Sequence, residues 1–188
     1  MSNPEEALKW IVGIFNKHNV PFQIAGGFAA RAHGSKRDLR DIDIFIPPDG
    51  FEKIFPDVKQ YLVSGPNHRI LGHFLGCYLF EIKKIFPDVK QYMKEFGQYY
   101  QPVFIDRWDV IYLTLDYPGQ SIDLADADNL RILDINTNKW MQEHIDLPSS
   151  EIKEVYGVSV SIMPKDRLIA YKRKVGREVD LIDIGQIK

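Results

Sequence analysis

The sequence lacks the features of a disulfide-stabilised or membrane-spanning protein. Cys77 is the only cysteine, so no internal disulfide can form, and this fits a reducing compartment. No apolar run approaches the ~20 residues that a membrane-spanning helix requires. The segment from Met1 to Lys9 is polar and acidic and does not have the pattern of a signal peptide. We therefore expect a cytoplasmic protein with no membrane partner.

The chain also lacks a large excess of charge of either sign. It has 24 Lys and Arg and 26 Asp and Glu, which gives a net charge of −2. This balance provides no general attraction to nucleic acids or anionic membranes, so a polyanionic ligand would have to meet a local basic patch. The length of 188 residues fits one domain, or a core with a helical appendage, that buries roughly 70% of its unfolded surface.

An acidic pair is predicted within a strand. The sequence reads Asp41-Ile42-Asp43 at the start of an apolar strand that continues to Ile46. Successive side chains of a strand alternate faces, so Asp41 and Asp43 should project from one side while Ile42 and Ile44 face the core. Two carboxylates this close repel unless a cation lies between them, and a divalent metal with hard oxygen ligands is the simplest candidate.

A glycine turn precedes the acidic pair. An apolar strand over 22–25 runs into Gly26-Gly27, and residues 28–33 favour a short helix. Because glycine has no Cβ, such a turn can approach a polyphosphate closely, and its N–H groups can bind phosphate oxygens. Each signal alone is more often a plain turn or a solvated pair of carboxylates. In this order, and joined by a basic segment, they predict a metal and phosphate site.

Two-metal phosphoryl transfer needs a further acidic ligand, and Asp123 is the candidate. Turn residues at 117–120 predict a hairpin with Asp123 on its returning strand, between Ile122 and Leu124. A carboxylate in so apolar a strand would be costly without a counter-charge. The alternative is a residue that caps the following turn. Asp109 and Asp116 are weaker rivals, since both are expected at strand ends facing solvent.

Two basic segments could meet the phosphates. Arg37 lies in the connector between the glycine turn and the acidic strand, and a planar guanidinium can bind two phosphate oxygens. Lys172 belongs to a basic cluster, residues 165–177, in a helix that Pro164 opens and Gly176 closes. Lys172 could reach inward from the apolar stripe of this helix toward a triphosphate, although a solvated lysine is the more common case.

The rest of the sequence gives less specific predictions. The spacing of apolar residues predicts a helix over 4–18, and 177–187 is expected to form another short helix. From Asn129 to the last basic helix the pattern is read as helical and loop-like. The nine residues KIFPDVKQY occur twice, at 53–61 and 84–92, and are expected to form two similar Pro-started helices. Two histidines, at 68 and 73, and the cysteine are too few for a zinc signature.

The motifs together resemble the nucleotidyltransferase superfamily that shares its fold with DNA polymerase β. The resemblance rests on Ala25-Gly26-Gly27, on Asp41-Ile42-Asp43-Ile44 and on Asp123. The run from Gly34 to Asp43 is similar to that of small bacterial aminoglycoside and lincosamide nucleotidyltransferases, with Lys36 and Leu39 where that run has Thr and His. The resemblance implies an α+β fold with a mixed β-sheet core flanked by helices, which we expect over 1–130, and a mainly helical C-terminal segment over 131–188.

We therefore predict a metal-dependent nucleotidyltransferase that moves a nucleoside monophosphate from an NTP to an acceptor hydroxyl and releases pyrophosphate. The expected catalytic metal ligands, for two Mg²⁺ ions, are Asp41, Asp43 and Asp123. The expected phosphate contacts are Gly26, Gly27, Arg37 and Lys172. The acceptor is either a small molecule or an RNA end. The alternatives are a non-catalytic nucleotide sensor or protein-binding member of the same fold, and a transferase that modifies RNA 3′ ends.

Overall fold

The computed structural model describes residues 3–62, 103–105, 107–110 and 112–187. Its α-helices are α1 (Pro4–His18), α2 (Gly26–Ala32), α3 (Pro48–Val58), α6 (Lys165–Val175) and α7 (Glu178–Gln186). Its strands are β1 (Gln23–Ile24), β2 (Asp41–Ile46), β3 (Val103–Ile105), β4 (Trp108–Val110), β5 (Tyr112–Tyr117), β6 (Gln120–Asp126), β7 (Leu130–Asp134), β8 (Lys139–Glu143), β9 (Glu151–Val155) and β10 (Val158–Ile162). Two short 3₁₀ helices, η1 (Lys59–Tyr61) and η2 (Leu147–Ser149), follow α3 and β8.

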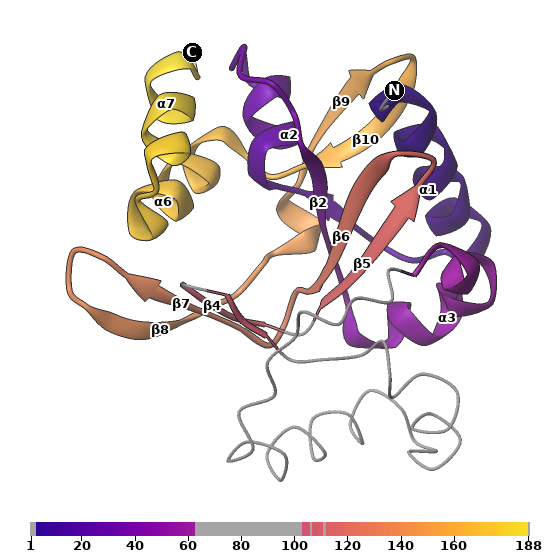
Figure 1. Ribbon diagram of the computed structural model, residues 1–188, viewed down its shortest axis with the longest axis horizontal. Helices are drawn as coiled ribbons and strands as arrows, with labels where there is room; N and C mark the ends of the chain where they lie inside the picture. Colours follow the sequence, from indigo (N-terminus) through magenta and orange to yellow (C-terminus); the bar gives the residue numbers. More distant parts are fainter. Residues whose placement is uncertain (1–2, 63–102, 106, 111, 188) are drawn as a thin grey trace, which may run out of the picture.

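A mixed six-stranded sheet forms the centre of the protein, in the order β5-β6-β2-β1-β10-β9. Strands β2 and β6 are parallel, as are β1 and β10, and the other neighbours are antiparallel. Figure 1 shows α1 and α3 on one side of this sheet and α6 and α7 on the other. The structure therefore confirms the α+β class and the mixed sheet flanked by helices.

Side-chain alternation in β2 and β6 divides the sheet into an apolar and a polar face. Ile42 and Ile44 of β2, and Ile122 and Leu124 of β6, are at most 1% exposed. They pack in the main hydrophobic core, and burying side chains of this kind contributes roughly 1.5–3 kcal/mol each. Asp41 and Asp43 of β2 and the alternate residues of β6 are only partly buried and project from the opposite face. This alternation fixes which side of the sheet carries the acidic residues.

Helix α1 forms as the sequence predicts. The side chain of Asn3 accepts a hydrogen bond from the backbone N–H of Glu6 at 3.2 Å and so caps the helix. Asn19 ends it in the left-handed conformation, at φ 52°. The apolar stripe of α1 is buried, and Trp10 stacks on Tyr117 of β5 with 4.5 Å between ring centroids. This helix therefore closes the core beside β5 and β6.

The prediction of a helical and loop-like stretch after Asn129 is wrong. Residues 130–162 instead contain β7, β8, β9 and β10, and β7 and β8 join β3 and β4 in a second, four-stranded antiparallel sheet. Most side chains of β8 and β9 are exposed on both faces, so these strands lack the alternation that identifies a strand in sequence. Tyr156 and Gly157, at φ 52° and 73°, form the two-residue turn between β9 and β10.

Predictions for the helices near the C-terminus are confirmed. Helix α6 follows Pro164 and ends at Gly176, which adopts φ 62°, and α7 is the expected short helix. The predicted helix start at the first repeat is wrong, because α3 begins at Pro48 and contains Pro56 within it. The second repeat and the histidine–cysteine set lie outside the described residues. No described helix is long and apolar enough to cross a membrane.

Candidate active site

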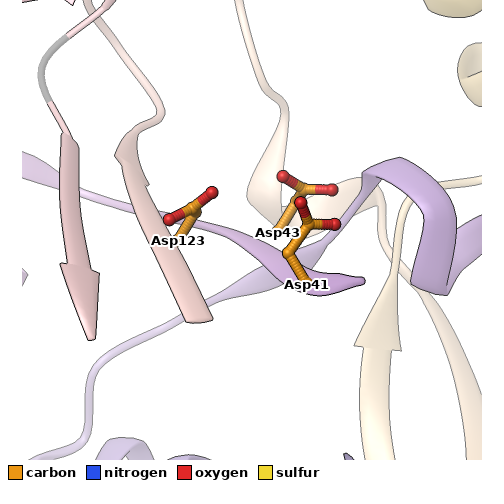
Figure 2. Close-up of side chains that lie close together, drawn as sticks. All are labelled: Asp41, Asp43 and Asp123. Atoms are coloured by element: carbon orange, nitrogen blue, oxygen red, sulfur yellow. The ribbon is translucent and has the colours of Figure 1, made fainter. Parts of the chain in front are cut away.

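Three carboxylates from neighbouring strands converge on the polar face of the sheet. Strands β2 and β6 run in parallel with Asp43 directly beside Asp123, and Asp41 lies two residues earlier on the same face of β2. One oxygen from each of the three side chains lies within 4.8 Å of the other two. Figure 2 shows these side chains projecting from the same side of the two strands. The structure thus brings together the three acids that the strand alternation and the hairpin predicted.

Burial and repulsion disfavour the ionised forms of Asp43 and Asp123. Burial, together with the charges of Asp41 and Asp123, raises the pKa of Asp43 to about 7, against a smaller opposing effect of Lys172 and Arg177. Burial and the charge of Asp41 also raise the pKa of Asp123, although the hydroxyl of Thr114 donates a 2.7 Å hydrogen bond to Asp123 Oδ1. Clustered hard oxygens with raised pKa values are what a divalent cation stabilises in ionised form.

The two glycines leave room for side chains of the site. A Cβ at residue 26 would lie 1.7 Å from Oδ2 of Asp43, and Gly26 has φ +56°. A Cβ at residue 27 would lie 2.4 Å from Nη2 of Arg37. Any larger residue at either position would therefore displace the carboxylate or the guanidinium. Sequence reasoning linked these glycines to a phosphate and missed their contacts with Asp43 and Arg37.

A cavity of about 510 Å³ opens over the three carboxylates. Its lining includes the two glycines and the three acids, Gly26, Gly27, Asp41, Asp43 and Asp123. Three arginines of the lining supply positive charge, namely Arg37, Arg40 and Arg177. The lining also has aromatic and apolar side chains, among them Trp108, Val110, Tyr112, Leu130, Tyr171 and Val179. The predicted rivals Asp109 and Asp116 do not line the cavity: Asp109 pairs with Arg131, and Asp116 is exposed.

The aromatic part of the site was not identified from sequence. The indole N–H of Trp108 donates a 2.6 Å hydrogen bond to the hydroxyl of Tyr171. The guanidinium carbon of Arg177 lies 4.6 Å from the centre of the Trp108 ring. Trp108 belongs to β4, whereas Tyr171 and Arg177 come from the C-terminal helices, so only the tertiary fold brings them together. No local spacing in the sequence indicates this cluster.

Lys172 has a different environment from the one expected. It is only 1% exposed and does not line the cavity. Its ammonium lies 2.9 Å from Asp180 Oδ1 and 2.9 Å from Asp183 Oδ2. The alternative of a solvated surface lysine is therefore wrong, and the ammonium is already held by two carboxylates. Arg37, in contrast, lines the cavity, and its guanidinium forms an ion pair with Asp183.

The fold of the whole chain is shared with solved nucleotidyltransferases. A candidate nucleotidyltransferase from Thermotoga maritima superposes with a TM-score of 0.59 at 12% identity, over 96% of this chain and 91% of that one. The chain has the nucleotidyltransferase fold. A lincosamide antibiotic adenylyltransferase with bound lincomycin superposes with a TM-score of 0.54 at 12% identity, over 100% of this chain and 96% of that one.

ANT(2″)-Ia in complex with adenylyl-2″-tobramycin gives a TM-score of 0.50 at 13% identity, over 99% of this chain and 88% of that one. The sequence matches no family model and no curated protein. The nucleotidyltransferase fold is therefore recognised from the structure, and the function has to be argued from the site.

Proposed function

We propose that this protein is a metal-dependent nucleotidyltransferase. It would move a nucleoside monophosphate from an NTP to an acceptor hydroxyl and release pyrophosphate. The observation that carries this proposal is the convergence of Asp41, Asp43 and Asp123 in a cavity that also holds a glycine turn and basic side chains. The shared fold with an adenylyltransferase solved with its antibiotic supports the same reaction class.

The donor set fits Mg²⁺. All three residues are aspartates. Burial and the charge of neighbouring carboxylates raise the pKa values of Asp43 and Asp123, and a hard divalent ion would favour their ionised forms. Asp41, Asp43 and Asp123 would together hold two ions. When bound, the ions would neutralise charge on the triphosphate and lower the pKa of the acceptor hydroxyl.

The glycine turn and the arginines would position the triphosphate. Gly26 and Gly27 are the first residues of α2, and the first N–H groups of a helix have no partner within it. Both glycines line the cavity together with Arg37, whose planar guanidinium suits bidentate binding of phosphate oxygens. Positioning of this kind supplies much of the rate enhancement in phosphoryl transfer, because the protein contributes little covalent chemistry.

The reaction replaces one bond to phosphorus by another. The acceptor oxygen bonds to the α-phosphorus, the bond from that phosphorus to the bridging oxygen breaks, and pyrophosphate leaves with the electron pair. The hydroxyl proton passes to water. The aromatic side chains Trp108, Tyr112 and Tyr171 also line the cavity and would offer the acceptor a surface to pack against.

The two alternatives are less favoured. A non-catalytic member of the fold would be indicated by Asp123 turned away from the other two acids, and Asp123 instead lies beside them. An RNA acceptor would draw on the cations of the cluster over 165–177, where Lys172 is buried in ion pairs and Lys174 pairs with Glu143, whereas Arg173 is exposed. We prefer a small-molecule acceptor because two neighbours of the same fold were solved with lincomycin and with adenylyl-2″-tobramycin. Strong salt dependence of RNA binding would instead favour an RNA end.

The experiment incubates purified protein with labelled NTPs, Mg²⁺ and separate pools of small hydroxyl compounds and tRNA. We expect label transfer into the small-molecule pool with release of pyrophosphate. Asp43→Asn should abolish both transfer and Mg²⁺-dependent NTP binding measured by calorimetry. Asp116→Asn, which removes an exposed carboxylate of the β5–β6 hairpin, should leave binding unchanged. Equal and metal-independent NTP affinities of the wild type and Asp43→Asn would contradict the proposal.

A further inference from the structure

A buried ammonium connects the two C-terminal aspartates that contact arginines of the cavity. Lys172 of α6 lies 2.9 Å from Asp180 and 2.9 Å from Asp183, both of α7. Each of the three side chains is at most 2% exposed. A buried ammonium of this kind is stable only when carboxylates compensate its charge and hydrogen bonds fix its position. We call Lys172, Asp180 and Asp183 the α7 charge network.

Each aspartate of this network also holds one arginine. Asp180 accepts hydrogen bonds from Arg177 Nε at 2.9 Å and from Arg177 Nη2 at 3.2 Å. Asp183 accepts from Arg37 Nε at 3.2 Å and from Arg37 Nη2 at 3.3 Å. In both cases the carboxylate takes the same two nitrogens of the guanidinium. Nη1 of Arg37 donates to the backbone carbonyl of Asp38 at 3.0 Å, and Nη1 of Arg177 is the nitrogen that these contacts leave for a further acceptor.

Both arginines line the cavity over the acidic residues. Arg37 packs against Gly27, whose missing side chain makes the space that the guanidinium occupies. Arg177 stacks on Trp108 at 4.6 Å and is close enough to Asp43 to oppose the rise in its pKa. Arg177, the residue that precedes α7, therefore lies near the carboxylates, whereas Arg37 comes from the connector before β2.

The charges of this assembly leave one positive charge uncompensated. Lys172, Arg37 and Arg177 are three cations, and Asp180 and Asp183 are two anions. Burial opposes ionisation of Asp180, but hydrogen bonds from Arg177 and Lys172 outweigh it and lower its pKa. Burial likewise opposes ionisation of Asp183, and the contacts with Arg37 and Lys172 lower its pKa. Both aspartates therefore stay charged and keep the two guanidinium groups in place.

We propose that Arg177 joins Arg37 as a contact of the nucleotide's triphosphate, which extends the function proposed above. We assign Lys172 and Asp180 as positioning residues that hold Arg177 and do not touch the nucleotide. The reason is preorganisation: a fixed guanidinium loses little conformational freedom when it binds a phosphate. The α7 charge network thus makes the C-terminal helices part of the phosphate site, although their aspartates repel anions.

The test uses inorganic triphosphate with Mg²⁺, because this probe has no base and no sugar. We expect Arg177→Met to weaken its binding roughly 10- to 100-fold in calorimetry, the range for loss of a charge-assisted hydrogen bond. Arg177→Lys should give an intermediate loss. Arg173→Met removes one exposed cation from α6 and should have little effect. Thermal unfolding of each variant verifies that it is folded at the measuring temperature.

A double-mutant cycle tests the positioning role. Asp180→Asn alone should weaken triphosphate binding, but it should add no further loss in the Arg177→Met background, because Asp180 acts through Arg177. Wild-type affinity of Arg177→Met, additive losses in the cycle, or absence of triphosphate binding by the wild type would each overturn the inference. Nucleotide transfer by the wild type, and its loss in Asp43→Asn, would remain a separate test of the proposed function.

Discussion

Gly26 lies directly against the carboxylate of Asp43, and a Cβ on residue 26 would be 1.7 Å from Asp43 Oδ2. The glycine turn and the acidic strand are therefore one unit. The space left by the missing Cβ is occupied by a candidate metal ligand. This contact explains the need for a glycine at position 26 more directly than a contact with a phosphate does.

We expect Gly26→Ala to misplace Asp43. The positive φ of Gly26 alone should cost an alanine about 1–2 kcal/mol of stability, and displacement of the carboxylate should weaken Mg²⁺-dependent NTP binding by about tenfold or more. Chemical denaturation and calorimetry measure the two effects. Gly13→Ala in α1 is the control, because a Cβ there meets nothing within 4 Å. It should stabilise the helix by about 0.5–1 kcal/mol, and unchanged binding by Gly26→Ala would contradict the explanation.

Mg²⁺ should stabilise the protein more at high pH than at low pH. A carboxyl whose pKa is raised in the folded state favours folding below its unfolded pKa, and this contribution is lost as the pH rises through the folded value. For Asp43 that loss extends from about 4 to about 7. Thermal unfolding should show a larger gain in Tm on adding Mg²⁺ at pH 8 than at pH 6.

Asp43→Asn should reduce the pH dependence of the metal-free protein. The amide does not titrate, so the stability lost between pH 4 and 7 should become smaller than in the wild type. A Tm gain from Mg²⁺ that is independent of pH in the wild type would contradict the assignment of these carboxylates to the ion.

Asp183 should be a major contributor to stability. It is fully buried between Lys172 and Arg37, and breaking one partner of a buried ion pair costs about 3–5 kcal/mol. Asp183→Asn should lose this amount at pH 7 in urea unfolding. Because the folded pKa of Asp183 is lowered, its contribution is present above the unfolded pKa and lost as the pH falls through the folded value.

The stability of Asp183→Asn should therefore differ less from that of the wild type under strongly acidic conditions than at pH 7. Glu5→Gln removes an exposed partner of Lys9 on α1 and should change stability by about 0.5 kcal/mol or less. Equal losses of stability in Asp183→Asn and Glu5→Gln would show that the α7 charge network does not stabilise the fold.

Trp108 should report ligand binding by fluorescence. It lines the cavity, whereas Trp10 packs on Tyr117 and Trp140 is exposed on β8. Binding of NTP with Mg²⁺ changes the surroundings of Trp108 alone, so we expect the emission change to disappear in Trp108→Phe. Trp140→Phe is the control and should retain the change. Persistence of the signal in Trp108→Phe would place the nucleotide elsewhere.

Local patterns in the sequence were sufficient to predict the acidic centre. Alternation along β2 placed Asp41 and Asp43 on one face, and the turn before Ser121 placed Asp123 on a returning strand. The pairing of β2 with β6 then brings Asp43 beside Asp123, because side chains at matched register of neighbouring strands lie on the same face. These relations involve short segments with strong periodicity, which is why they could be predicted.

The rest of the site depends on contacts between distant segments. Asp183 binds Arg37 across 146 positions of sequence, and Lys172 is buried only because α7 packs against α6. A basic helix with no visible partner is read as a solvated surface, so the ion pairs of Lys172 could not be predicted. Strands β8 and β9 were missed for a related reason, since exposure of both faces removes the alternating pattern.

The most direct measurement is a crystal structure with Mn²⁺ and a non-hydrolysable NTP, in which anomalous scattering locates the metal. We predict Mn²⁺ bound by oxygens of Asp41, Asp43 and Asp123, with the triphosphate between these ions and the Gly26-Gly27 turn. Anomalous peaks only at other sites, or a nucleotide bound away from the three carboxylates, would contradict the central claim.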